Sequence, residues 1–276
     1  MSILSVNSSL GTAIPTFVMD SRNEQALANK WAQGNGQVKS DIAYFQAKAP
    51  TLTSAAALTK DYRSLKIVLG AYNVSGLLAY PALTNQLLTQ DPSSSSSVAQ
   101  KIGNPSYLAF VNAFNQFKNN PLGSSSNVST VVNSYVVNSY EAAQNTQTPG
   151  LQNALTFNRT ASQITSIAQL MTNTPALTVA VAQTGVTFNT YANMSYDQQV
   201  AFLTRKLNLS DFQHPATVTK MAEQYLVQAV QDPGEWNASA ASTNTVVSLL
   251  GGGSDTSELS LFGVGSSSNP VLSLFA

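Results

Sequence analysis

Apolar residues along this chain follow a mainly helical pattern. Between Ser54 and Tyr72 they recur at intervals of three and four, which places them on one face of an α-helix. Thr53 or Ser54 suits the N-cap of this helix, because a short hydroxyl side chain accepts a hydrogen bond from the first turn. The apolar positions are Ala57, Leu58, Leu65, Val68, Leu69 and Tyr72. We therefore predict one amphipathic helix across this stretch.

The same spacing predicts helices on both sides of this stretch. One begins at Ser21, is interrupted by Gly34 and Gly36, and resumes until Pro50. Further helices begin at two prolines, since proline is favoured in a first helical turn. These prolines are Pro81 and Pro105.

Two long helices are predicted in the second part of the chain. One extends from Leu151 to Met171, and the other carries valines and tyrosines between Val131 and Tyr140. The valines and tyrosines would also suit a strand. We prefer a helix because no second alternating run lies nearby to pair with it. The predicted fold class is therefore all-α, a multi-helix bundle.

Three stretches lack a helical period and suggest how the chain is divided. Residues 1–20 are predicted to form an N-terminal arm, either flexible or ordered only on packing. The Gly/Ser/Asn-rich residues 121–129 are predicted as a linker between a first helical half, residues 21–120, and a second, residues 130–234. Residues 235–276 are a low-complexity tail whose few apolar groups do not offset the entropy of ordering it. We predict a flexible tail, or one that folds against a partner.

The two predicted halves resemble each other. Three segments of the first half have counterparts in the same order in the second, which suggests an internal repeat. The pairs are Ser64–Val74 with Ala176–Val186, Gln86–Gln90 with Ala201–Arg205, and Ser106–Phe110 with Gln224–Gln228. The alternative is that amphipathic helices resemble each other by chance.

The chain has few charged residues. They make up 9% of the composition, against about 25% in an ordinary soluble protein. Thirteen basic and thirteen acidic residues cancel, so no summed positive potential favours nucleic acid as a partner. Weak repulsion between copies favours a protein partner or self-association. No run of apolar residues is long enough to predict a membrane-spanning helix.

Residues for enzyme chemistry are scarce. There is no cysteine, so thiolate metal sites and a cysteine nucleophile are excluded. The single histidine, His214, lacks the further ligands that zinc needs and is best explained as a residue leading into a helix. No serine nucleophile motif or phosphate-binding loop is present. We predict no enzyme activity, no metal and no cofactor.

Two segments of the sequence carry a family resemblance. The run DIAYFQAKAPTLTSAAALTKDYRSLKIVLGAYNV (Asp41–Val74) and the run YDQQVAFLTRKLNLSDFQHP (Tyr196–Pro215) resemble the bacterial family known as domain of unknown function 1217. The resemblance extends over about Ser21–Gln231. It implies an uncharacterised protein whose relatives are often encoded near flagellar genes in alphaproteobacteria. This chain departs from the family in having less charge and more Ser, Thr and Asn.

These observations lead to two main hypotheses. The first is a non-enzymatic structural or assembly protein, with the flagellar link implied by the resemblance, and either cytoplasmic or exported without a cleaved signal peptide. The second is a helical binding module that takes a peptide or small ligand between its halves. The candidate partner contacts are apolar residues in the tail. They are Leu261, Phe262, Leu274 and Phe275.

Overall fold

The computed structural model describes residues 3–236, and their side chains from residue 11 onward. Every regular element of this part of the chain is a helix, so the predicted all-α class is confirmed. The helices of the first part are α1 (Ile3–Gly34), α2 (Gly36–Lys48), α3 (Ala55–Lys60), α4 (Tyr62–Ala71), α5 (Pro81–Thr89), α6 (Val98–Ile102) and α7 (Pro105–Phe114). Those of the second part are α8 (Ser125–Asn145), α9 (Leu151–Thr160), α10 (Ile167–Thr172), α11 (Thr174–Ala182), α12 (Phe188–Ala192), α13 (Tyr196–Lys206), α14 (Pro215–Gln231) and α15 (Pro233–Trp236).

Two stretches that were each predicted as one helix, Ser54–Tyr72 and Leu151–Met171, are each divided into two helices, and a side chain caps the second helix of each. The stretch after Ser54 is divided at Asp61, whose carboxylate accepts a hydrogen bond of 2.9 Å from the Ser64 amide and starts α4. The stretch Leu151–Met171 is divided into α9 and α10, and Ser166 caps α10. Ser and Asp side chains compete with the helical backbone for its own donors, which the apolar spacing does not reveal.

Helix α1 runs through the described part of residues 1–20, for which the sequence predicts an arm that is flexible or ordered only on packing. The helix includes Pro15. Ala13 and Phe17, one turn apart, are fully buried in a core otherwise formed by the second half of the chain. Tertiary packing therefore outweighs the poor helical propensity of this stretch. The helix is kinked at Asn23, where φ is −130° and ψ is 21°.

The predicted linker is also shorter than expected. Helix α8 begins at Ser125, so the second part of residues 121–129 is helical. The assignment of 21–120 and 130–234 as similar halves stays a prediction. The predicted tail lies outside the described residues from position 237 onward.

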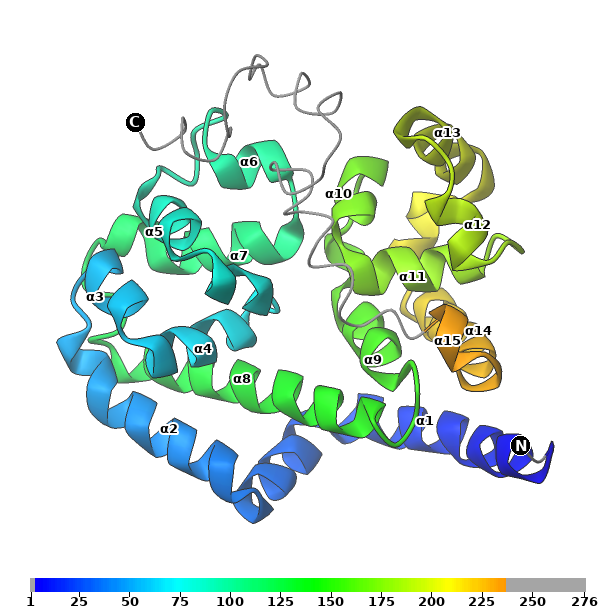
Figure 1. The fold of residues 1–276 in the computed structure, drawn as a ribbon, viewed down its shortest axis with the longest axis horizontal. Helices are drawn as coiled ribbons and strands as arrows, with labels where there is room; N and C mark the ends of the chain where they lie inside the picture. Colours follow the sequence, from blue (N-terminus) through cyan, green and yellow to red (C-terminus); the bar gives the residue numbers. More distant parts are fainter. Residues whose placement is uncertain (1–2, 237–276) are drawn as a thin grey trace. The chain divides into compact units, whose positions relative to one another are not determined.

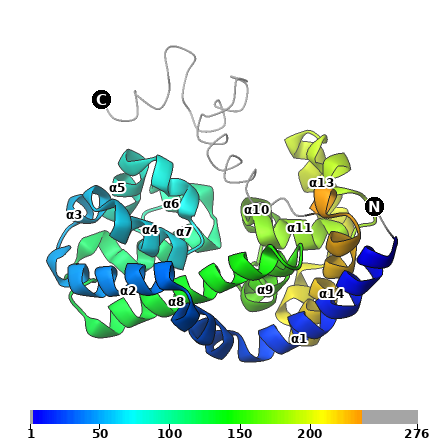
Figure 2. The same ribbon diagram turned by 60° about the horizontal axis from the view of Figure 1, so that its bottom comes forward.

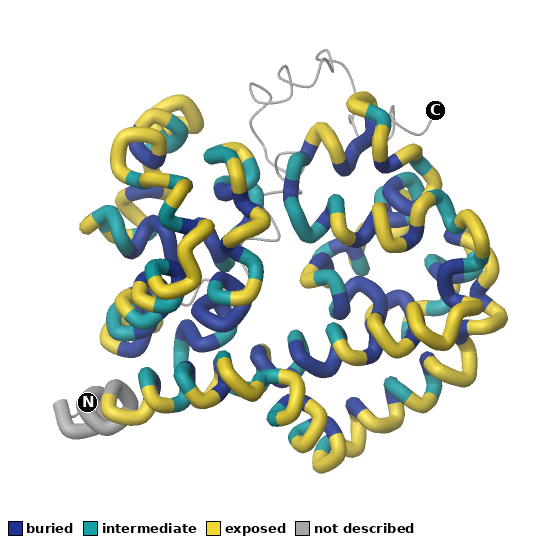
Figure 3. The backbone as a smooth tube through the Cα atoms, turned by 180° about the vertical axis from the view of Figure 1, so that it is seen from behind, coloured by how far each residue is buried: buried dark blue, intermediate teal, exposed yellow. Residues whose placement is uncertain are grey.

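Helices α1 and α8 pack against each other and against helices far away in the sequence. Helix α8 contacts α4, and α1 contacts α9 and α14, as both ribbon views show (Figures 1 and 2). Figure 3 shows buried residues where helices meet and exposed residues on the opposite faces. No helix within residues 3–236 is long and apolar enough to cross a membrane.

Candidate functional site

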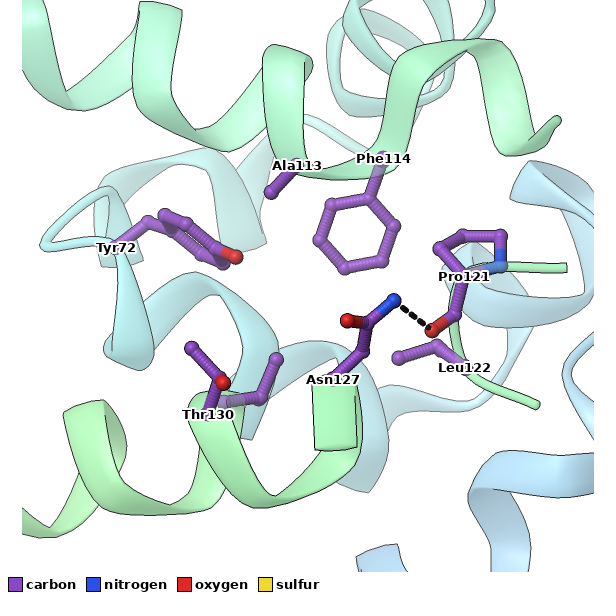
Figure 4. Close-up of a pocket in the computed structure, with 8 residues that line it drawn as sticks. Tyr72, Ala113, Phe114, Pro121, Leu122, Asn127 and Thr130 are labelled. Carbon is purple, nitrogen blue, oxygen red and sulfur yellow. Dashed lines mark hydrogen bonds between the residues drawn. The ribbon is translucent and has the colours of Figure 1, made fainter. Parts of the chain in front are cut away.

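A small pocket lies where the end of α4, the end of α7 and the start of α8 meet (Figure 4). Its volume is about 140 Å³. Ala113 and Thr130 are exposed at its rim, so the pocket is open to solvent. Its lining residues are Tyr72, Ala113, Phe114, Pro121, Leu122, Asn127, Thr130 and Val131.

Aromatic rings form two walls of this pocket. The Phe114 ring is buried, and its centroid lies 6.1 Å from that of Tyr72 in an edge-on arrangement. The Tyr72 hydroxyl points into the space beside Phe114 in Figure 4 and has no hydrogen-bond partner within residues 11–236. Burial raises the pKa of Tyr72, so its hydroxyl stays neutral and can donate a hydrogen bond at neutral pH. The pocket thus combines apolar walls with a polar group that has donor capacity left.

The remaining wall is held by an unusual turn. Between α7 and Pro121, five residues other than glycine have positive φ: Asn115, Gln116, Phe117, Asn119 and Asn120. Asparagine tolerates this region, whereas Gln116 and Phe117 each cost roughly 1–3 kcal/mol there. The turn ends at Pro121, whose carbonyl oxygen accepts a 3.0 Å hydrogen bond from the Asn127 amide. That bond fixes the start of α8 against the turn and keeps the pocket open between them.

The size of the pocket limits what it can hold. Pockets for metabolites and cofactors are typically about 300–1,000 Å³, whereas an apolar cavity of about 150 Å³ accommodates a molecule the size of benzene. A volume of about 140 Å³ therefore suits one aromatic or branched aliphatic side chain.

A second candidate is a buried charge cluster where α1, α8 and α9 meet. The Arg159 guanidinium on α9 lies 2.5 Å from the carboxylate of Glu141 on α8 and 2.8 Å from that of Glu24 on α1. Glu141 is fully buried and also accepts a 3.0 Å hydrogen bond from Thr156. Burial raises the Glu141 pKa, against the opposing attraction of Arg159. Two carboxylates thus share one cation.

Asp20 adds a third carboxylate on α1. It is fully buried, and burial raises its pKa, against the opposing effect of the nearby Tyr140 hydroxyl, while Glu24 raises it further. Within the described residues, no three Asp, Glu or His side chains are arranged to hold a metal ion. Through Arg159, the cluster links α1, α8 and α9 by ion pairs.

We expect Asp20→Asn to stabilise the protein at neutral pH. Because its pKa is raised, the Asp20 carboxyl holds its proton more tightly in the folded state than in the unfolded chain. The contribution of Asp20 to the free energy of unfolding therefore falls as pH rises above 3.8, the ordinary pKa of an aspartate. Asparagine removes this loss without changing the shape of the side chain. The midpoint of thermal unfolding is expected to rise at pH 7 and to match that of the unsubstituted protein near pH 3. An equal shift at both pH values would contradict the role of ionisation.

A separate network joins α2 to α4. Asp41 on α2 is buried and lies 2.7 Å from the Arg63 guanidinium, and Tyr44 donates a 2.7 Å hydrogen bond to Asp61. Burial alone would raise the Asp41 pKa, but hydrogen bonds from Arg63 and Gln37 hold it below the usual range. These polar groups form hydrogen bonds and ion pairs with one another.

The structure places the residues considered in the sequence as follows. His214 is exposed and directly precedes α14, where its side chain forms no capping hydrogen bond. Leu261, Phe262, Leu274 and Phe275 lie outside the described residues. Neither the pocket nor the charge cluster was predicted. Their members come from segments up to 135 positions apart, as in the contact between Glu24 and Arg159, and one sequence carries no signal for that proximity.

Comparison with known proteins identifies a family and a fold. A family model described as "protein of unknown function (DUF1217)" matches residues 71–218. An X-ray structure of an Agrobacterium tumefaciens protein is similar, with a TM-score of 0.65 and 19% sequence identity over 79% of this chain and 93% of that one. At this identity the likeness shows the fold alone. No curated protein matches the sequence.

Proposed function

Because this chain belongs to the DUF1217 family, whose description assigns no activity, we propose a function from its structure. The protein is a non-enzymatic assembly protein that holds one apolar side chain of a partner protein in the pocket between α4, α7 and α8. The observation that carries this proposal is the size of the pocket, about 140 Å³. Interfaces gain much of their affinity from a few side chains that fill such pockets.

The chemistry of the pocket supports a protein partner. Aromatic walls favour a partner aromatic or branched side chain, since offset ring pairs add about 0.5–1.5 kcal/mol beyond burial. The Tyr72 hydroxyl offers a hydrogen bond to a polar tip or a backbone carbonyl of the partner. The surroundings are rich in uncharged polar residues, such as Asn127 and Thr130, which suits the polar rim of an interface.

A second candidate is a binding module for a small ligand. It is favoured by the origin of the lining residues, because Tyr72 and Phe114 belong to the predicted first half and Val131 to the second. Titration of the full chain with phenol or indole, followed by NMR, distinguishes the assembly role from the ligand-binding role. The assembly role predicts weak binding typical of a single side-chain mimic, whereas tight binding of a small molecule would favour the ligand module.

The flagellar link rests on the family resemblance and is tested genetically. We expect deletion of the gene to impair swimming, because an assembly protein of the flagellum would be missing. Ala113→Arg, at the pocket rim, is expected to fail to restore swimming, because the long charged side chain blocks the pocket. Ala201→Arg is the matched control, since Ala201 is an exposed helical alanine on α13.

The outcome is read together with the location of the protein. Restored swimming by Ala201→Arg but not by Ala113→Arg, at equal protein levels, supports the proposal. Normal swimming of the deletion strain, together with a purely cytoplasmic location of the protein in the parent strain, would exclude the flagellar role. Equal restoration by both variants would exclude the pocket.

A further inference from the structure

Element boundaries in the two parts of the chain recur at a fixed distance. The short 3-10 turns Ala49–Thr51 and Ala161–Gln163 differ by 112 positions, as do α3 and α10, which begin at Ala55 and Ile167. The capping residues follow the same rule, since Ser54 and Ser166 each accept a hydrogen bond from the amide three positions on. The same distance relates the fully buried Phe45 and Phe157.

Backbone geometry follows the same distance. Asn73 after α4 has a φ of 56°, and Gly185 after α11, 112 positions later, has a φ of 81°. A left-handed residue at matched positions reflects matched helix ends, since such residues commonly terminate helices. By this distance, the last residue of α8, Asn145, corresponds to position 33, one residue before the end of α1. Helix α8 is therefore the counterpart of the C-terminal two-thirds of α1.

Each of these two counterpart helices packs chiefly on the other part of the chain. Helix α8 docks on α4, where Asn138 donates hydrogen bonds of 2.8 and 3.0 Å to the carbonyl oxygens of Gly70 and Ala71. Helix α1 docks on α9 and α14, with Phe17 fully buried among second-half core residues. One pair of partner helices is equivalent, because α8 contacts α2 and α1 contacts α9, the counterpart of α2. The other partners, α4 for α8 and α14 for α1, are not counterparts at this distance. The arrangement has the form of a helix exchange within one chain.

The connection between α1 and α2 is suited to reopening. Gly34 ends α1, Gly36 begins α2, and Asn35 between them caps α2 by accepting a 3.0 Å hydrogen bond from the Val38 amide. A methyl group added at Gly34 or Gly36 would meet no atom within 4 Å. These three residues separate α1 from α2, so their replacement by alanine would favour a helix that continues from α1 into α2.

We infer that α1 and α8 are equivalent helices that have exchanged places within the chain, and that the face of α9 and α14 that binds α1 also accepts α1 from a second copy of this chain. Such an exchange uses an existing interface, so a dimer forms without any new contact surface, at the cost of the contacts between α1 and α2. This inference concerns self-association and is independent of the pocket.

The test uses engineered cysteines, since the chain contains none of its own. The Trp31 ring on α1 lies 6.1 Å from that of Tyr140 on α8, measured between centroids. Differently tagged full-length chains, one with Trp31→Cys and one with Tyr140→Cys, are mixed, refolded together and treated with a short bismaleimide. Only docking of α1 on a second copy joins the two tags. The single chain with both cysteines reports docking within one copy.

The same cysteine substitutions are also made in chains whose connection between α1 and α2, the hinge, carries Gly34→Ala/Asn35→Ala/Gly36→Ala. We expect the joined product to rise severalfold over the unaltered hinge, because a continuous helix does not fold back on its own chain. Gly11→Ala, elsewhere on α1 and equally free of clashes, is the control and is expected to leave the yield unchanged. Pairing Trp31→Cys with Ala201→Cys measures random collision.

A joined product that exceeds the collision control supports the inference. The inference is overturned if only the single chain with both cysteines reacts, in both the hinge variant and the unaltered hinge, at every concentration at which the protein remains helical. Should the hinge variant fail to fold, the unaltered hinge refolded at high concentration decides between these results. Ala113→Arg is expected to exchange normally, so failure of the pocket hypothesis would be recognised separately.

Discussion

Arg159→Met is expected to lower the free energy of unfolding by about 2–3 kcal/mol at pH 7. Removing one partner of a buried pair typically costs about 3–5 kcal/mol, and we take a smaller value because the Arg159 side chain is one third exposed. The substitution keeps most of the apolar contact of the side chain. It leaves the fully buried Glu141 beside Glu24 without a cation.

The pH dependence of this loss identifies its cause. Without Arg159, the Glu141 carboxyl gains stability by holding its proton, so its pKa in the folded state rises further above the ordinary 4.5. With Arg159 present the Glu141 pKa is already raised to about 8, so the two proteins differ in the protonation of Glu141 chiefly above that pH, and the deficit grows as pH rises from 7 to 9. Urea unfolding at pH 7 and pH 9 measures both values.

Two variants serve as controls for Arg159→Met. Glu141→Gln combined with Arg159→Met removes both buried charges and is expected to recover most of the lost stability. Arg205→Met changes an exposed arginine on α13 and is expected to alter stability by less than about 0.5 kcal/mol. A loss for Arg159→Met that is independent of pH would show that packing, and not the unpaired carboxylate, is responsible.

Gly150→Ala is expected to lower the free energy of unfolding by about 2–5 kcal/mol. Gly150 joins α8 to α9 with a φ of 86°, which is unfavourable for any residue with a Cβ atom. An alanine Cβ there would lie 2.4 Å from the Cβ of Ala229 and 3.2 Å from the Tyr225 hydroxyl oxygen. That hydroxyl donates a 2.9 Å hydrogen bond to the Trp236 carbonyl oxygen, so a shift of α14 would disturb a buried bond.

Gly185→Ala is the matched control for this prediction. Its φ of 81° is nearly the same, but no atom lies within 4 Å of the added methyl group. We expect a loss of about 1–2 kcal/mol from the backbone alone. The difference between the two variants in urea unfolding therefore measures the steric clash. Equal losses would contradict the close packing of α14 on the connection after α8.

The sequence predicts those elements whose signals are local. Pro81 and Pro105 begin α5 and α7 as expected, and Ser54 caps α3, because these residues act within one helical turn. The apolar spacing of Val131 and Tyr140 likewise identifies α8. Asp61 could not be predicted as a helix boundary, since an aspartate fits both a helix surface and a cap.

Features that depend on distant parts of the chain were not predicted. The helicity of the N-terminal stretch depends on Phe17 packing among residues more than 130 positions away. The charge cluster was missed because Asp20, Glu141 and Arg159 meet only after folding. A charge within an apolar helical stripe, as with Asp20 three positions after Phe17, is the one local signal that these residues offer. The pocket has no such signal, since its wall is a turn of left-handed residues.

Photo-cross-linking in living cells tests whether a side chain of a partner protein occupies the pocket. The photoreactive residue benzoyl-phenylalanine replaces Thr130 at the pocket rim or, as a control, the exposed Ala201 on α13. We expect an adduct between position 130 and one other protein, which mass spectrometry maps to an apolar side chain of that protein. Ala113→Arg is expected to abolish this adduct. The absence of any adduct from position 130, or the same adduct from position 201, would contradict this proposal.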